Sequence, residues 1–209
     1  MKQIINHFTD DDLYKLSMCC SVIDNYPRAQ VKYQFVDRNN TVYPTGFADE
    51  LRRQIEALEG VIITDDEIDF MKRRCSYMPH WFFTYLRGYR FSREWVNVSQ
   101  DIDGHLHVEF EGSWSDTILL EVKVLAMISE LFYIMTGQIA RLDYVQLYNK
   151  TCQKAERLLT AGCVFSDFGT RRRASFEAED TVVRALKNTY QSRDWKGKLV
   201  GTSNVYIAM

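Results

Sequence analysis

The sequence predicts an α/β fold, in which a mixed α+β N-terminal region precedes the beginning of an α/β barrel. Two segments near the C-terminal end carry this prediction. Ser166–Arg173 and Leu199–Val205 each combine a short apolar strand, a glycine-bearing turn and the first residues of a helix. A strand, a helix and a second strand joined by short connections form a parallel βαβ unit. A closed eight-stranded barrel needs about 250 residues, so we expect only its first portion here.

The composition is that of an ordinary globular domain and excludes functions that depend on a strong overall charge. Of the 209 residues, 46% are hydrophobic and 26% are charged, and the net charge is −2. This charge provides no general attraction for nucleic acid or acidic membranes, so any basic function must be local. The most apolar stretch, Ile118–Met135, is interrupted by four polar residues and predicts a buried amphipathic helix rather than a membrane span.

Cysteine and histidine usage indicates a reducing compartment and no metal centre. The five cysteines are odd in number, lack C-x-x-C spacing and follow no signal peptide, which indicates the cytoplasm. Only His105 and His107 share a predicted strand face, and two ligands without a third make a weak metal site. We therefore expect no bound metal.

The first part of the chain predicts two helices around one strand. Thr9–Asp12 has the residues of a helix N-terminus, with acidic side chains facing the helix dipole. The helix is expected over about 11–25, ending before Tyr26-Pro27. Ala29–Val36 alternates apolar and polar residues and predicts a half-buried strand. Gly46–Leu58 has apolar residues at helical spacing.

The next part predicts two more helices and a hairpin. Thr64–Cys75 begins with a capping-box pattern, and Pro79–Arg87 predicts a short helix rich in aromatic residues. Glu94–Ser99 and His105–Glu111 alternate with a period of two, and Asp103-Gly104 lies in the turn between them.

Two long helices follow, after which the pattern changes to βαβ. Ser115–Met135 and Gln138–Thr160 are predicted as helices, the second ending at Ala161-Gly162. We therefore predict a mixed α+β domain over 1–137 and the first part of an α/β barrel domain over 138–209. The predicted βαβ elements are strand Cys163–Asp167, helix Ser175–Tyr190, strand Lys198–Thr202 and a further helix starting near Asn204.

Three consecutive arginines, Arg171–Arg173, follow the first of these strands. A guanidinium group binds phosphate through two parallel N–H donors and keeps its charge at any working pH. Because cations at a helix N-terminus oppose the helix dipole, this position favours an external anion. The alternative is a solvated helix start, in which the arginines pair with Glu177, Glu179 and Asp180. The residues alone leave both open.

Aromatic and small polar residues could complete an anion site. Phe168 lies at the strand end, where its ring could either stack on a planar ligand or pack under the loop. Tyr14 occupies the first turn of the first helix, where an exposed tyrosine is also unremarkable. Gly201-Thr202-Ser203 could cradle a phosphate or a ribose hydroxyl, although this tripeptide alone is weak evidence.

Four motifs occur together in a specific order: Thr9–Lys15, Tyr33–Asn39, Phe168–Phe176 and Gly201–Val205. This is the order seen in nicotinate phosphoribosyltransferases, and Gly112-x-Trp114 followed by Glu121 fits as well. Since the motifs span nearly the whole chain, their order is far more specific than any one of them. The chain therefore resembles the N-terminal half of such an enzyme, of the type II phosphoribosyltransferase family.

The resemblance implies a fold, a reaction and a site. Members pair an α+β domain with an irregular α/β barrel. They make nicotinate mononucleotide from nicotinate and phosphoribosyl pyrophosphate in NAD salvage, with ATP and Mg²⁺ as co-substrate and activator. By resemblance, Phe168 and Tyr14 stack on the pyridine ring, Tyr14 coming in the family from the neighbouring subunit, and Arg171 contacts pyrophosphate. The other substrate-binding candidates are Thr170, Arg172, Thr202 and Ser203.

The resemblance also implies what lies outside these residues. The histidine that ATP phosphorylates in the family follows the Gly-Thr-Ser-Asn segment, so we expect it beyond Met209 and expect no activity from this portion alone. We further expect a homodimer with shared active sites and neither a nucleic-acid nor a membrane partner. The alternatives are a related nicotinamide or quinolinate phosphoribosyltransferase, and a non-catalytic half-length binding protein.

Overall fold

The computed structural model describes residues 1–209 as helices, strands and short connections. The strands are β1 (Gln30–Gln34), β2 (Val96–Gln100), β3 (Leu106–Ser113), β4 (Val164–Asp167) and β5 (Lys198–Thr202). The helices are α1 (Leu13–Asn25), α2 (Phe47–Ala57), α3 (Asp65–Arg74), α4 (His80–Gly88), α5 (Trp114–Thr117), α6 (Glu121–Met135), α7 (Tyr144–Thr160) and α8 (Phe176–Gln191).

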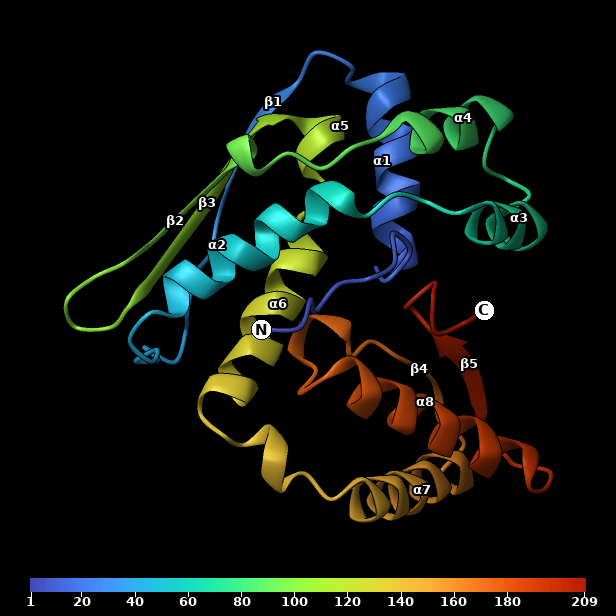
Figure 1. The fold of residues 1–209 in the computed structure, drawn as a ribbon. Coiled ribbons are helices and arrows are strands. Elements are labelled where there is room, and N and C mark those ends of the chain that lie inside the picture. Colours follow the sequence, from blue (N-terminus) through green and yellow to red (C-terminus); the bar gives the residue numbers. More distant parts are fainter.

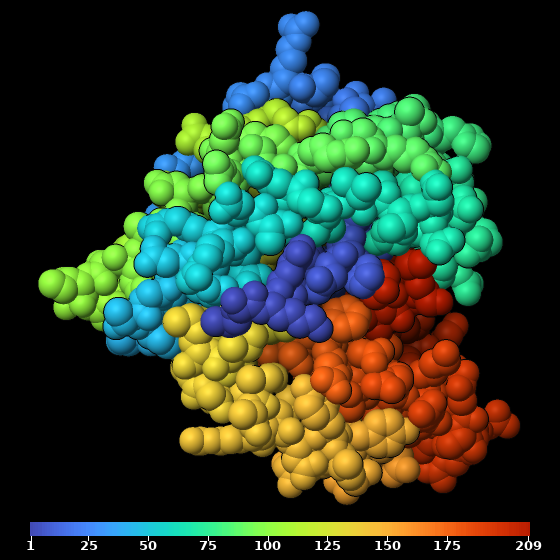
Figure 2. Space-filling view, in the orientation of Figure 1, coloured from blue at the N-terminus to red at the C-terminus, as the bar shows by residue number.

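Helix α6 runs through the middle of the molecule between two groups of elements (Figure 1). The three-stranded sheet and helices α1–α5 lie on one side, and α7, α8, β4 and β5 lie on the other. The first residues of the chain cross the face shown in Figure 2 between α2 and the C-terminal elements. The N-terminus is therefore placed to contact both groups.

The N-terminal sheet is antiparallel, with strand order β1-β3-β2. The predicted hairpin is confirmed, and Gly104 adopts φ 88° in its turn, a conformation that favours glycine. Val98 and Val108 are register partners with buried side chains. The apolar residues that alternate along β2 and β3 therefore lie on the buried face of the sheet. Helix α2 packs on both β2 and α6.

Helix α6 contributes five buried residues to a large hydrophobic core: Val124, Ala126, Met127, Ile128 and Leu131. The predicted helix over 115–135 is divided into α5 and α6, because the fully buried Ile118–Leu120 turns the chain between them. The polar residues that interrupt this stretch have specific partners: Lys123 and Glu130 are both buried and ion-paired. No helix in the structure has the length and apolar composition needed to span a membrane.

The C-terminal elements form the predicted parallel βαβ unit. Strands β4 and β5 pair in parallel, and α8 connects them and packs on α7 around a small cluster of Ala155, Leu159 and Leu186. The sheet has two strands and no barrel is closed, as expected for the beginning of a barrel.

Two predicted element boundaries were wrong. Helix α7 starts at Tyr144 rather than Gln138, because Asp143 accepts a hydrogen bond from the Gln146 backbone N–H and caps the helix there. The helix expected near Asn204 is a turn over 205–208, in which the Asn204 side chain accepts a hydrogen bond from the Ile207 N–H at 3.1 Å.

Candidate active site

A hollow of about 990 Å³ opens between the end of β1, helix α6 and the turn that follows β4. Its walls include several aromatic residues, among them Tyr33, Phe35 and Phe132, and three arginines, Arg38, Arg171 and Arg172. The structure thus places Phe168, Arg171 and Arg172 at one hollow, together with the loop after β1. Thr170, Thr202, Ser203 and Tyr14 are not among the lining residues.

Two aromatic rings face each other next to this hollow. The rings of Tyr14 and Phe168 are stacked, with centroids 6.0 Å apart and planes at 29°. Burial, and then the nearby Glu121 carboxylate, raise the pKa of Tyr14 to about 12, so its ring stays neutral at physiological pH. A planar ring between them needs a spacing of about 7 Å, two van der Waals contacts of about 3.5 Å. Phe168 is 53% exposed on a loop, so it can move outward by the missing distance.

This pair is formed within one chain. Tyr14 of α1 and Phe168 of the same chain are partners, and the expectation from resemblance that a neighbouring subunit supplies a Tyr14 to the site stays a prediction. Helix α1 presents Tyr14 because the preceding residues are anchored to the C-terminal turn: the backbone N–H of Leu13 donates to the Ser203 carbonyl at 2.8 Å.

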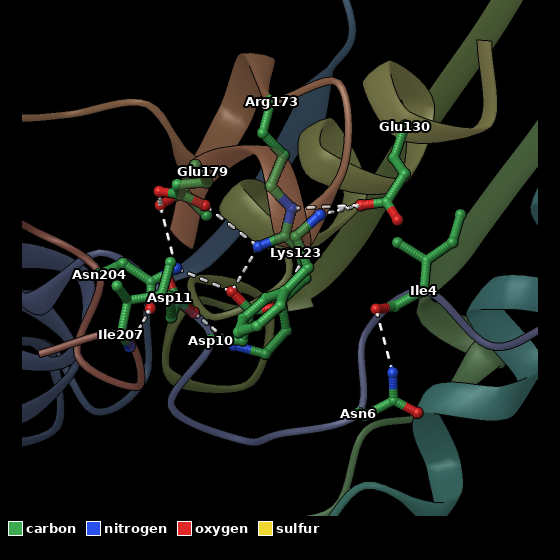
Figure 3. Close-up of polar contacts among 12 residues, drawn as sticks. Ile4, Asn6, Asp10, Asp11, Lys123, Glu130, Arg173, Glu179, Asn204 and Ile207 are labelled. Carbon is green, nitrogen blue, oxygen red and sulfur yellow. Dashed lines mark hydrogen bonds and ion pairs between the residues drawn. The ribbon is translucent and has the colours of Figure 1, made fainter. Parts of the chain in front are cut away.

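The three consecutive arginines have three different environments. Arg173 is buried and binds Asp10 through two hydrogen bonds of 2.7 and 2.8 Å, with Glu130 and Glu179 at 3.3 and 3.2 Å (Figure 3). Arg172 is exposed and makes no ion pair. Arg171 is half-buried and lies between two carboxylates. The two open interpretations therefore apply to different residues: Arg173 pairs internally, and Arg171 and Arg172 line the hollow.

Arg171 is the arginine of the hollow that lies over the Tyr14 ring. Its Nε lies 3.5 Å from an Asp12 oxygen, its terminal nitrogen lies 3.6 Å from a Glu121 oxygen, and its guanidinium carbon lies 5.9 Å from the Tyr14 ring centroid. These separations exceed the usual 2.7–2.9 Å of charge-assisted hydrogen bonds. The N–H donors of Arg171 are therefore available to an anion in the hollow.

The predicted hydroxyl residues all donate to carboxylates inside the protein. Thr170 is buried and donates to Glu179 at 2.6 Å, Thr202 donates to Asp167 at 2.8 Å, and Ser203 donates to Asp12 at 2.5 Å. In this state the three can offer a ligand only hydroxyl lone pairs and backbone groups. Their assignment as substrate-binding residues stays a prediction.

Helix α1 begins directly after the acidic run Asp10–Asp12, as predicted, but the Asp12 side chain makes no hydrogen bond that caps it. Asp10 binds Arg173 and Asn204, and Asp11 forms a fully buried pair with Lys123 at 2.6 Å (Figure 3). Asp12 binds Ser203. Each carboxylate thus fixes a different distant segment beside the site.

Sequence reasoning missed several residues of the site. Arg38 lines the hollow although Tyr33–Asn39 had been quoted only as a motif, and Asp12 and Glu121 had no assigned role. The available signal was that Asp12 and Arg38 lie inside the ordered motifs and that Glu121 follows Gly112-x-Trp114. A local reading gives such residues no partner, because the partners lie more than a hundred residues away.

Two family models match this chain. The nicotinate phosphoribosyltransferase (NAPRTase) N-terminal domain matches residues 9–129, and the NAPRTase family matches residues 163–209. Together these matches include Tyr14, Phe168 and Arg171, but not helix α7.

Individual relatives agree with these models. A nicotinate phosphoribosyltransferase from Methanosarcina mazei is 33% identical, over 98% of this chain and 53% of the relative. Nicotinate phosphoribosyltransferase 1 from Pseudomonas aeruginosa is 37% identical, over 99% of this chain and 51% of the relative. The crystal structure of the nicotinate phosphoribosyltransferase from Porphyromonas gingivalis superposes with a TM-score of 0.90 at 37% identity, covering 98% of this chain and 51% of that one. The chain spans about half the length of the curated relatives it matches.

Proposed function

Since this chain belongs to the nicotinate phosphoribosyltransferase family, we propose that it holds nicotinate and the pyrophosphate of phosphoribosyl pyrophosphate for nicotinate mononucleotide synthesis in NAD salvage. One observation carries the proposal: a facing pair of rings, Tyr14 and Phe168, adjoins an arginine whose N–H donors are free for an anion. A planar, negatively charged ring and a polyphosphate are the ligands that these two features suit.

The proposed reaction uses the site mainly to position its reactants. Stacking would hold the pyridine ring edge-on, so that its nitrogen attacks the anomeric carbon of the ribose. The bond from that carbon to the pyrophosphate oxygen then breaks, and pyrophosphate leaves with the electron pair. Arg171 and Arg172 would stabilise the charge that grows on the departing oxygens. Thr170, Thr202 and Ser203 would line the nicotinate and ribose side.

We propose that ATP and Mg²⁺ take part as co-substrate and activator rather than as resident groups. No cluster of three or more histidine, cysteine, aspartate or glutamate residues is placed to hold a metal ion. Mg²⁺ usually keeps several waters and binds through substrate phosphates plus one or two carboxylates, which fits a hollow with few acidic residues. When bound, it would neutralise phosphate charge.

The ATP-coupled step in the family uses a histidine, which we expect beyond Met209. No histidine lines the hollow. We therefore propose that the 209 residues bind substrates, and that ATP-coupled turnover needs the other half of the enzyme. A homodimer with shared active sites remains part of the proposal, as does a cytoplasmic location, which the five unpaired cysteines support. A nucleic-acid partner is not proposed, because the net charge is only −2.

Nicotinate binding to the 209-residue chain tests the proposal directly. We expect Phe168→Ala to weaken nicotinate binding by about tenfold in calorimetric titration, through lost stacking and lost buried area. Tyr77→Ala is the matched control, since Tyr77 is an exposed aromatic outside the hollow, at 64% exposure against 53% for Phe168. Equal affinities for the wild type and Phe168→Ala would contradict the assignment.

Competition between pyridines separates the alternatives. Nicotinate should displace nicotinamide from the site, because the carboxylate adds an interaction with the arginines of the hollow. Tighter binding of quinolinate, which carries two carboxylates, would favour a quinolinate enzyme. Binding of nucleotides without any pyridine would favour a non-catalytic binding protein.

A further inference from the structure

The guanidinium of Arg171 is held between two carboxylates that come from distant parts of the chain. Asp12 lies directly before α1, and Glu121 is the first residue of α6. Oδ2 of Asp12 is the only buried side-chain polar atom in the structure without a hydrogen bond, and the nearest charge to it is the Arg171 Nε at 3.5 Å. A buried carboxylate oxygen without a donor is costly, so this arrangement calls for an explanation.

Each of these carboxylates is itself fixed by a second partner. Ser203, at the end of β5, donates to the other oxygen of Asp12 at 2.5 Å. Lys15 donates to Glu121, and Lys15 is buried with its ammonium 5.3 Å from the Tyr14 ring centroid and 5.8 Å from that of Tyr33. Neither carboxylate can therefore rotate freely, and together they restrict Arg171 on two sides.

We propose that Asp12 and Glu121 are positioning residues, which hold the Arg171 guanidinium beside the two rings with its N–H donors unspent. This role rests on the proposed function, because an ordered Arg171 serves a site that binds an anion next to a stacked pyridine. An arginine already ordered loses less side-chain freedom when the anion binds. The long contacts at 3.5 and 3.6 Å orient Arg171 without using its donors fully.

Positioning and simple charge predict opposite changes in the affinity for pyrophosphate when Glu121 is neutralised. Two carboxylates near an anion site repel the anion, so on charge alone Glu121→Gln should strengthen pyrophosphate binding. Positioning predicts the reverse, a loss of about tenfold, the cost of ordering one arginine side chain. Glu111→Gln is the control, since it removes the same charge from an exposed position on β3.

Titration of the wild-type chain and the variants with inorganic pyrophosphate at fixed ionic strength gives the first readout. Weaker binding in Glu121→Gln and Asp12→Asn, with Glu111→Gln unchanged, is the expected result. Equal or tighter binding in Glu121→Gln would overturn the inference. Glu121 is partly exposed, with 23% of its side chain accessible, so this variant should fold even if Asp12→Asn does not.

A second readout does not depend on any ligand. In ¹⁵N-labelled protein, the Arg171 Nε–H resonance can be identified by its loss in Arg171→Lys, and its order parameter can be measured by relaxation. We expect a higher order parameter than that of the exposed Arg172, and a lower one for Arg171 in Glu121→Gln. A mobile Arg171 in the wild type, or an unchanged order parameter in the variant, would overturn the positioning role. Absence of pyrophosphate binding with an ordered Arg171 would instead refute the proposed function and leave the positioning established.

Discussion

Arg173→Met tests whether the buried ion cluster beside the site holds the fold together. The side chain of Arg173 is 1% exposed and faces three carboxylates, those of Asp10, Glu130 and Glu179. Replacing it with methionine preserves much of the apolar volume but leaves three buried acidic groups without their cation. Removing one partner of a buried ion pair costs about 3–5 kcal/mol. We expect a loss of that size in the free energy of unfolding at pH 7.5.

Urea denaturation followed by circular dichroism measures this loss, and the neighbouring residue provides the control. Arg172 is exposed and makes no ion pair, so Arg172→Met should change stability by less than about 0.5 kcal/mol. The deficit of Arg173→Met should also shrink toward pH 5, as the stranded carboxylates take up protons. A loss below about 1 kcal/mol, or equal losses in the two variants, would refute the claim that this cluster is structural.

Three further predictions concern stability. Burial raises the pKa of Glu179 to about 7 and that of Asp11 to about 6, so the folded chain binds protons that the unfolded chain releases. The free energy of unfolding should therefore rise by about 4 kcal/mol from pH 8 to pH 5. Denaturation at several pH values measures this, and Glu179→Gln should flatten the curve. Gly197→Ala should lower the free energy of unfolding by at least about 2 kcal/mol, because a Cβ would lie 2.5 Å from the Cys163 carbonyl oxygen. Gly88 has open space around it, so Gly88→Ala should be neutral or stabilising. Thermal denaturation of the two variants measures the difference. Glu67→Gln should lower the free energy of unfolding by about 2 kcal/mol, since the buried carboxylate accepts hydrogen bonds from both Thr9 and Thr64. The denaturation midpoint measures this loss, and an unchanged midpoint would show that those hydrogen bonds are dispensable.

The sequence predicted the elements whose determinants are local. The capping box at Thr64 and Glu67 is present, and the hairpin turn falls at Gly104. The same kind of reasoning predicted the helix start at Asp10–Asp12 but missed the buried ion pairs of Asp10 and Asp11, because a helix start and such pairs share one local pattern. What distinguishes them is a partner such as Arg173, 163 residues away, and no periodicity records it. Glu67 shows both cases, because its cap was predictable and its bonds to Thr9 were not.

The same distinction explains why the site was only partly predicted. Phe168 and Arg171 follow a strand, so the rule that ligands bind at the carboxyl ends of parallel strands identified them. Arg38 and Glu121 reach the hollow from the other side of the molecule, and their place depends on how the first sheet and α6 pack. Site residues at the end of a strand can be predicted from the local sequence. Residues on the opposite wall of a hollow can be identified only once the tertiary fold is known.

The site therefore depends on contacts across the predicted boundary at residue 137. Tyr14 and Glu121 come from one side of it, and Phe168, Arg171 and Ser203 come from the other. The three consecutive aspartates make the connection, because each binds a different segment and a short stretch of backbone then fixes those segments relative to one another. A shift of this stretch would move the tyrosine ring and the arginine together. The proposed domains can thus be separate in sequence pattern, while the geometry that binds a ligand belongs to neither alone.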